Sequence, residues 1–375
     1  MSIQVLKPKF HVEECLDAIR ECLEKGWTGM GYKTVEFEEA WKNYTGHKHA
    51  YFLNSNTVGL HLAVKMLKMK NGWQDGDEII STPITFVSTN LAIIYENMHP
   101  VFADVDEYLC IDPDDVEKKI TNKTRAIIFV GYGGRVGQLN KIIKICNKHG
   151  LKLILDAAHM SGTKVDGVCP GTWDGVDVAV YSYQAVKNLA TGDSGCICWS
   201  DDDFATLNRE LAWCGINKDT YARSNKGTYS WKYDVDNVGY KYNGNAIMGA
   251  IALVQLRYLD EENARRREIV KMYDDGFRDN PKIKVVQAPF AEECSYHLYE
   301  LIVPDREKLL NKLADEGINC GVHYRDNTEY KIFAYGDGQA PRAREISKHL
   351  ITMPLHMWLT DEDIKRIIKS VNDNV

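Results

Sequence analysis

Two segments of the chain place side chains that could do proton chemistry directly after apolar runs. The first run ends at Asp156, which His159 follows closely. The second run ends at Ser182, which is followed by Lys187 and a glycine-rich turn. A carboxylate, an imidazole and an amine can each bind or transfer a proton. Because ligands of parallel α/β sheets bind at the carboxyl ends of the strands, we expect these groups to share one site.

Each of these residues also has an ordinary structural interpretation. An Asp after a strand often caps the next helix, and a single Lys after a strand is usually a solvated surface residue. Lys187, however, is the only charged residue between Ala179 and Leu189, and it lies between two apolar strands. This placement favours a buried amine.

The elements that position these groups alternate between strand and helix up to about residue 200, which predicts a mostly parallel sheet covered on both faces. Helical periodicity predicts helices at 58–69, 86–98, 112–120 and 139–149. Apolar runs predict strands at 51–54, 78–81, 101–105, 126–130, 151–155, 176–181 and 196–199.

The character of the sequence changes after residue 200. A polar, aromatic stretch at 218–241 shows no clear periodicity, which usually indicates a functional segment or an interface. Beyond it the pattern predicts helices within 246–277, near 307–314 and at 361–371, and strands at 284–287 and 297–303. We therefore expect a large α/β domain over 1–250 and a small α+β domain over 251–375.

Composition narrows the class of protein. The chain has 375 residues, of which 44% are hydrophobic and 26% charged, and this excludes disordered and low-complexity proteins. A net charge of −7 does not favour nucleic-acid binding. No apolar run is long enough to span a membrane, and the first residues lack the apolar core of a secretory signal. We expect neither a nucleic acid nor a membrane as partner.

The ten cysteines are better interpreted as free thiols than as a disulfide set. There is no CxxC motif, and Cys146 and Cys198 lie in apolar runs. No cysteines and histidines cluster at metal-ligand spacing, and His47 and His49 are expected at the surface. The pattern predicts no metal site and a reducing, cytoplasmic location.

The two chemical segments, a strand followed by DAAH and a strand followed by SYQAVKN and a TGDSG turn, resemble the DegT/DnrJ/EryC1/StrS sugar aminotransferases. These are pyridoxal 5'-phosphate (PLP) enzymes of the fold-type-I aminotransferase class. The resemblance runs nearly end to end, through GWTGMG from residue 26, NSNTVGLHLA from 54, GDEII from 76, TFVST from 85, PVFADVD from 100, GYKYN from 239, VHY from 322 and MPLH from 353. It implies the fold-type-I architecture.

The resemblance also implies roles for single residues. Lys187 would carry PLP as a Schiff base and move the substrate proton, and Asp156 would keep the ring nitrogen protonated. His159 would contact the ring hydroxyl. The pyridoxamine form would be the intermediate form of the cofactor.

Further cofactor contacts are implied for five residues. Phe86 would stack on the ring, and Asn56 and Thr57 would offer backbone amides to the phosphate at a helix N-terminus. Ser182 would add a hydroxyl, and Asn243 would reach the phosphate from the other subunit.

The chain departs from the family pattern at three places. Asn56 stands where the SGT segment of the family has glycine, and Gly131-Tyr-Gly-Gly134 replaces the frequent His-Leu-Tyr-Gly. The family turn TGEGG reads TGDSG from Thr191. These changes leave the PLP chemistry intact and suggest an unusual substrate pocket. Lys187 argues against the branch of the family that has histidine there and dehydrates sugars.

The leading hypothesis is transfer of an amino group from an amino acid, with L-glutamate as the expected donor, to a nucleotide-linked keto-sugar in amino-sugar or surface-polysaccharide biosynthesis. One alternative keeps PLP but takes a small phosphorylated ketone or keto-sugar without a nucleotide. A different class of function is a PLP-binding regulator without turnover. A dinucleotide-dependent dehydrogenase fails because no GxGxxG follows the first strand.

Seven residues form the expected acceptor site: Arg223, Lys226, Tyr229, Trp231, His323, Tyr324 and Arg325. The cations would bind phosphate, because an acidic chain needs local positive charge to hold an anionic substrate. The aromatic side chains would stack on a base. The aromatic segment and the resemblance together predict a homodimer in which each active site is closed by a loop of the partner.

Overall fold

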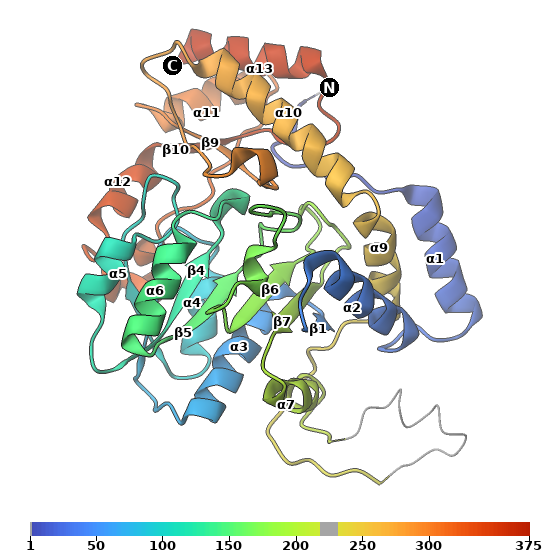
Figure 1. Ribbon diagram of the computed structural model, residues 1–375. Helices are drawn as coiled ribbons and strands as arrows, with labels where there is room; N and C mark the ends of the chain where they lie inside the picture. The colour runs from blue at the N-terminus through green and yellow to red at the C-terminus, as the bar shows by residue number, and fades with distance from the viewer. Residues whose placement is uncertain (1, 218–231) are drawn as a thin grey trace.

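A seven-stranded sheet forms the centre of the larger part of the molecule (Figure 1). The computed structural model describes residues 2–217 and 232–375. The strands lie in the order β1-β7-β6-β5-β4-β2-β3, and only β7 runs antiparallel to its neighbours. Their bounds are β1 His49–Leu53, β2 Glu78–Ser81, β3 His99–Phe102, β4 Thr124–Val130, β5 Lys152–Asp156, β6 Val178–Ser182 and β7 Gly195–Trp199. The predicted mostly parallel sheet is confirmed.

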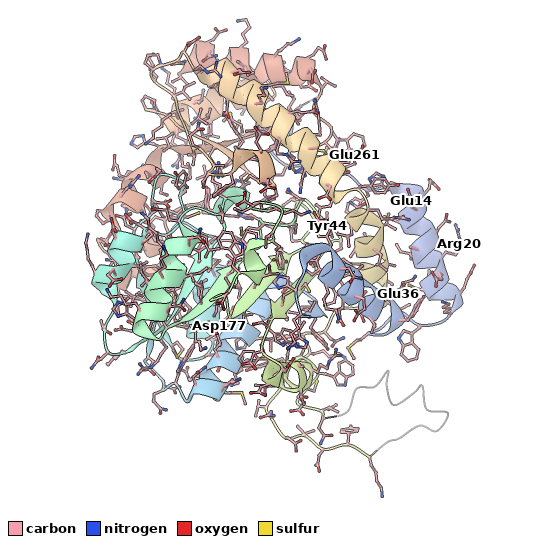
Figure 2. The ribbon with its side chains drawn as sticks, viewed as in Figure 1. Glu14, Arg20, Glu36, Tyr44, Asp177 and Glu261 are labelled. Carbon is pink, nitrogen blue, oxygen red and sulfur yellow. The ribbon has the colours of Figure 1, made fainter. Side chains whose placement is uncertain are left out.

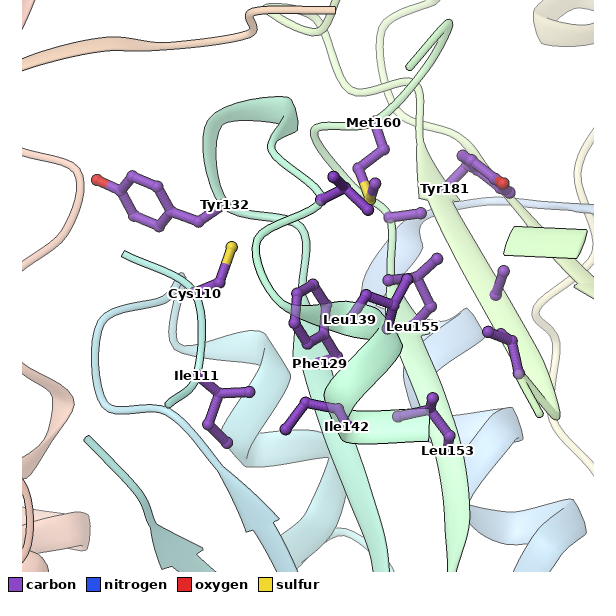
Figure 3. Close-up of a cluster of buried hydrophobic side chains, with 14 of the residues drawn as sticks. Cys110, Ile111, Phe129, Tyr132, Leu139, Ile142, Leu153, Leu155, Met160 and Tyr181 are labelled. Carbon is purple, nitrogen blue, oxygen red and sulfur yellow. The ribbon is translucent and has the colours of Figure 1, made fainter. Parts of the chain in front are cut away.

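Both faces of this sheet are buried, because alternate strand residues enter different hydrophobic clusters. On β5, Leu153 and Leu155 enter one cluster, whereas Ile154 enters the other. Figure 3 shows Leu139 and Ile142 of α6 beside Phe129, Leu153 and Leu155. The opposite cluster is filled mainly by α3. The helices within residues 2–217 are α1 Val12–Glu24, α2 Tyr32–Thr45, α3 Asn56–Asn71, α4 Ser88–Ile94, α5 Pro113–Lys119, α6 Leu139–His149 and α7 Asp203–Ala212.

Capping residues determine where several of these helices begin or end. The side chain of Asp112 accepts a hydrogen bond from Asp114 N (2.9 Å), and Pro113 takes the first position of α5. Gly150 ends α6 with a φ of 65°, a conformation that costs glycine little. Ser55 caps α3 by accepting from Val58 N (3.4 Å). This cap places the first turn of α3 at the sheet's carboxyl edge.

A second, three-stranded antiparallel sheet of order β10-β9-β8 lies in the C-terminal part, under α10 and α13 (Figure 1). Its cluster includes Ile3, which pairs with Ile318. Residue 250 lies inside α9, which contacts α1 and α2, and the domain division there stays a prediction. An ion pair between Glu14 and Arg257 joins α1 to the end of α9. Glu14 is labelled on α1 in Figure 2. The bounds are α9 Ala246–Leu256, α10 Leu259–Phe277, β8 Lys284–Val285, β9 Tyr299–Ile302, α11 Arg306–Asp315, α12 Pro341–His349, β10 Leu350–Met353 and α13 Asp361–Asn374.

Some local expectations were wrong. The helix predicted at 86–98 is shorter in the structure, where α4 spans only Ser88–Ile94. A turn precedes it, in which Thr89 N donates to Phe86 O. His47 was expected at the surface, but it is buried, and its Nε2 lies 3.0 Å from the Tyr181 hydroxyl oxygen.

All ten cysteines are free, and eight of them are buried.

Neither a membrane-spanning helix nor a metal-binding cluster occurs in the part of the chain that the structure describes. None of the helices within 2–217 and 232–375 is both long and apolar enough to cross a bilayer. Over the same residues, no group of three or more His, Cys, Asp or Glu side chains could hold a metal ion.

Candidate active site

A cavity of about 410 Å³ lies where the carboxyl ends of β4, β5 and β6 meet. Val130, Asp156 and Ser182, the last residues of these strands, all line it. This is the place that the parallel order of the strands predicts for a ligand. Nine residues named from the sequence line the cavity: Asn56, Thr57, Phe86, Asp156, His159, Ser182, Lys187, His323 and Tyr324.

Asp156 is a buried carboxyl group held in a fixed orientation. Its Oδ2 accepts from the Thr89 hydroxyl (2.8 Å), and its Oδ1 accepts from Ala158 N (3.2 Å) and more weakly from Asn56 Nδ2 (3.5 Å). Burial raises the pKa of Asp156, while these hydrogen bonds and the charge of Lys187 oppose that rise. A carboxylate in this setting is best stabilised by a further N–H donor or a cation from within the cavity.

Lys187 supplies an amine whose basicity is reduced. Burial lowers its pKa to about 8, and the negative charge of Asp156 offsets only part of this effect. With that pKa roughly a tenth of the side chains are neutral at pH 7, whereas an ordinary lysine is almost wholly charged. Lys187 can therefore act as a nucleophile or as a base near neutral pH.

His159 is a hydrogen-bond donor of fixed direction. The backbone N–H of Gly133 donates to its Nδ1 (3.1 Å), so in the neutral ring the hydrogen is on Nε2. Burial lowers the pKa of His159 well below its ordinary value and keeps the ring neutral. Its Nε2 lies 3.0 Å from the Tyr324 hydroxyl and can donate to an oxygen at that place.

The departure at Asn56 is accommodated without filling the anion site. The Asn56 side chain points down to the sheet, where Nδ2 donates to Val180 O (3.1 Å). Because this amide is bonded to the sheet, it does not cap the first turn of α3, where an anion site would use the backbone N–H groups of Asn56 and Thr57. A Cβ at Gly195 would lie 2.7 Å from Asn56 N, so β7 can approach this turn only because residue 195 is glycine.

A second departure, at residues 131–134, supports the histidines. Gly133 and Gly134 have φ values of 62° and 98°, and a Cβ on Gly134 would lie 2.4 Å from Ser295 Oγ. The turn lets Gly133 donate its N–H to His159 and accept the backbone N–H of His297 (2.9 Å). The expected change of the substrate pocket at these glycines thus stays a prediction, and their visible effect is to hold two imidazoles.

Phe86 lies at the mouth of the cavity. It is 58% exposed, and its ring centroid is 6.2 Å from that of Tyr324. A large exposed aromatic side chain beside a cavity can stack on a planar ligand.

Two of the predicted site residues that the structure describes, Asn243 and Arg325, do not line the cavity. Asn243 donates from Nδ2 to Gly244 O (2.9 Å). Arg325 is exposed and forms an ion pair with Glu329. Four other predicted site residues lie outside the described residues: Arg223, Lys226, Tyr229 and Trp231.

Three polar residues of the site were not singled out from the sequence: Thr89, Asn188 and His297. Thr89 holds Asp156, and His297 lines the cavity next to Lys187. His297 precedes β9, more than a hundred residues after Lys187, so only the fold brings the two together. Asn188 could have been noticed as the polar neighbour of the central lysine.

The donor set of the cavity fits PLP, the cofactor that the sequence pattern implies. A phosphate needs the helix N-terminus of α3 and hydroxyls such as that of Ser182. A buried carboxylate can keep the ring nitrogen of PLP protonated, and an amine of lowered pKa can react with the carbonyl group of PLP. The cavity presents all of these groups together.

Comparison with known proteins gives the same indication for the whole length. A family model described as the DegT/DnrJ/EryC1/StrS aminotransferase family matches residues 10–372. The spore coat polysaccharide biosynthesis protein SpsC of Bacillus subtilis is 34% identical over 379 residues, which cover 97% of this chain and 95% of SpsC.

Solved structures agree with the match. Helicobacter pylori PseC, an aminotransferase involved in the biosynthesis of pseudoaminic acid, superposes with a TM-score of 0.89 at 26% identity, over 100% of this chain and 99% of PseC. The PLP form of Spr1654 from Streptococcus pneumoniae superposes with a TM-score of 0.90 at 27% identity, over 100% of this chain and 98% of Spr1654. A PMP form of Spr1654 gives the same TM-score and identity.

Proposed function

The chain belongs to the DegT/DnrJ/EryC1/StrS aminotransferase family and is a PLP-dependent aminotransferase, and from this premise we propose that its acceptor is a nucleotide-linked keto-sugar and its donor L-glutamate. The observation that carries the amino-transfer part is the burial of Lys187 opposite Asp156 in one cavity. The sugar part is supported by the likeness to PseC, an aminotransferase of pseudoaminic acid biosynthesis, and to SpsC, a spore coat polysaccharide biosynthesis protein.

When bound, PLP supplies an electron sink for the electron pair left behind as a proton leaves the substrate carbon. Asp156 would keep the proton on the ring nitrogen, which strengthens that sink. Lys187 would take that proton at Nζ and hold it for the next proton transfer. His159 would donate from Nε2 to the ring hydroxyl oxygen, in the direction that Gly133 fixes.

The cofactor would be oriented by the mouth and floor of the cavity. Phe86 would cover one ring face, while the first turn of α3, with Asn56 and Thr57, and the Ser182 hydroxyl would bind the phosphate. His323 and Tyr324 line the same cavity and would face the acceptor.

The cations that bind a phosphate group of the acceptor must come from residues other than the described ones that line the cavity. Among the described residues that line the cavity, Lys187 is the one lysine and no arginine occurs. We propose that Arg223, Lys226 and Arg325 supply this charge, and that Tyr229 and Trp231 stack on the base. Arg325 would have to leave Glu329 to do so.

The nucleotide requirement is tested with matched keto-sugars that carry or lack the nucleotide diphosphate. We expect kcat/KM to fall about 100-fold without the nucleotide, because base and phosphate contacts assist transition-state binding. Arg223→Ala, Lys226→Ala and Arg325→Ala should each lower kcat/KM for the nucleotide-linked acceptor. Equal kcat/KM values for the two acceptors would refute the nucleotide and favour a small phosphorylated ketone or keto-sugar.

We further propose a homodimer with shared active sites, in which Asn243 reaches the partner's cofactor. Light scattering should give twice the mass of the 42.7 kDa chain. Mixing the Lys187→Ala and Asn243→Ala variants, with subunit exchange, should restore about a quarter of wild-type activity, because half the dimers are mixed and each has one intact site. A fully active monomer, or no gain on mixing, would contradict the shared site.

We also propose a reducing, cytoplasm-like compartment, which the ten free cysteines support. Fractionation of the native cells tests this location.

A further inference from the structure

The imidazole of His297 lies beside the amine of Lys187. His297 Nε2 is 3.4 Å from Lys187 Nζ, and the ring is 3% exposed. Its other nitrogen, Nδ1, is 3.1 Å from Asn188 Oδ1. Either nitrogen of a neutral imidazole can carry the hydrogen, so the role of Nε2 toward Lys187 depends on what fixes Nδ1.

Two backbone carbonyls fix the direction of the hydrogen bonds behind His297. Ser161 O accepts from Asn263 Nδ2 (3.0 Å), so Asn263 turns its Oδ1 to Asn188. Asn188 Nδ2 donates to that oxygen (2.8 Å) and to Ser295 O (2.8 Å). Both hydrogens of the Asn188 amide are then used, and its remaining group, Oδ1, can only accept.

The direction of this chain determines the tautomer of His297. Since Asn188 Oδ1 accepts, His297 Nδ1 must carry the hydrogen. In the neutral ring Nε2 then has a lone pair, and it points at an amine or ammonium that can only be its donor. The polarity is the reverse of that of His159, whose Nε2 carries the hydrogen.

The surroundings keep His297 neutral, as an acceptor must be. Burial lowers the pKa of His297 well below its ordinary value, and the positive charge of Lys187 lowers it further. His159, Arg266 and His323 add smaller effects of the same sign. His297 therefore does not compete with Lys187 for the proton near neutral pH.

We propose that His297 is a positioning residue whose Nε2 accepts a hydrogen bond from Lys187 Nζ when this nitrogen is free of the cofactor. The bond aims Nζ into the cavity and stabilises the ammonium that forms when Lys187 takes the substrate proton. The proton comes from the substrate carbon, stays on Nζ, and leaves with the next transfer, while His297 remains neutral throughout. This inference rests on the role proposed above for Lys187.

Two substitutions separate this role from a merely structural one. The amide of His297→Asn can occupy the place of Nδ1 and keep the bond to Asn188, but it cannot reach Lys187. The amide of His297→Gln can reach the place of Nε2 and offer an oxygen to Lys187. The two variants are both polar and differ by one methylene group, and His47→Gln removes a buried imidazole outside the cavity as the control.

The first readout is made on the cofactor-free protein and does not need activity. Acetic anhydride labelling over a pH series, with mass spectrometry of the Lys187 peptide, gives the midpoint of Lys187 ionisation. We expect His297→Asn to move this midpoint about one pH unit lower, because the ammonium loses an acceptor. His297→Gln and His47→Gln should leave it near the wild-type value. An unmoved midpoint in a folded His297→Asn variant would overturn the proposal.

The second readout is the rate of the first half-reaction with L-glutamate in the PLP-loaded protein. His297→Asn should slow it about 10-fold or more, as loss of support to a proton-transferring group does, and His297→Gln should restore most of the rate. Equal slowing in both variants would reduce His297 to a structural residue.

A measurement on the wild-type protein covers the case in which a variant fails to fold. Nitrogen-15 NMR of histidine-labelled protein should find His297 with a hydrogen on Nδ1 and none on Nε2. A hydrogen on Nε2 would overturn the proposal. If instead Lys187→Ala stayed active, the role of Lys187 would fail, whereas the tautomer and the labelling midpoint report on His297 alone.

Discussion

Lys187→Ala is expected to reduce transamination about 10⁴-fold or more, because one substitution would remove both the proposed covalent link to the cofactor and the proposed proton-transferring base. Lys187 is the only lysine among the described residues that line the cavity. Its amine is buried, and burial lowers its pKa. Single-turnover kinetics with L-glutamate measure the loss. Reduction with borohydride should fix PLP to the wild-type chain and not to the variant.

The control for this prediction is Lys141→Ala, which removes an exposed lysine on α6, away from the cavity. It should retain wild-type kinetics and borohydride-fixable PLP. A Lys187→Ala variant with near wild-type turnover would show that another group carries the cofactor.

Asp156→Asn is expected to keep PLP binding and slow transamination about 100-fold, which is the usual cost of one preorganised electrostatic contact. The neutral amide cannot hold the ring nitrogen protonated, yet it retains the size of Asp156 and can still accept from Thr89. Stopped-flow measurement of the half-reaction gives the rate, and absorbance titration gives the cofactor affinity.

Asp177→Asn is the matched control for Asp156→Asn. The Asp177 carboxylate accepts hydrogen bonds from Leu153 N (2.8 Å) and from Lys152 Nζ (2.8 Å). It lies near the start of β5, at the opposite end of this strand from Asp156 (Figure 2). This variant should change stability slightly and leave the half-reaction unchanged. If Asp156→Asn behaved like Asp177→Asn, Asp156 would be no more than a cap.

The sequence allowed prediction of the sheet and of the residues at its edge, because those signals are local. An apolar run followed by Asp156 or by Lys187 shows both a strand and its carboxyl end. Caps such as Asp112 with Pro113 are also complete within a few residues. The sheet could therefore be predicted from hydrophobic periodicity and from the residues that cap the helices.

Features that depend on distant parts of the chain could not be predicted in this way. His297 reaches Lys187 because Gly133 O holds its backbone N–H, and Asn188 is oriented by Asn263 of α10. β10 is four residues long and pairs with β9 across more than forty residues, so no local pattern marked it. His47 looked exposed because its partner Tyr181 is far away in the sequence.

The most direct test of the central claim is a two-step single turnover with the purified, PLP-loaded protein. L-glutamate should convert the visible absorbance of the PLP form into that of the pyridoxamine form and yield one 2-oxoglutarate per subunit. Adding a nucleotide-linked keto-sugar should then restore the first spectrum and yield one amino-sugar. If L-glutamate and the other common amino acids left the spectrum unchanged, the protein would bind PLP without transferring an amino group, and the account would be wrong.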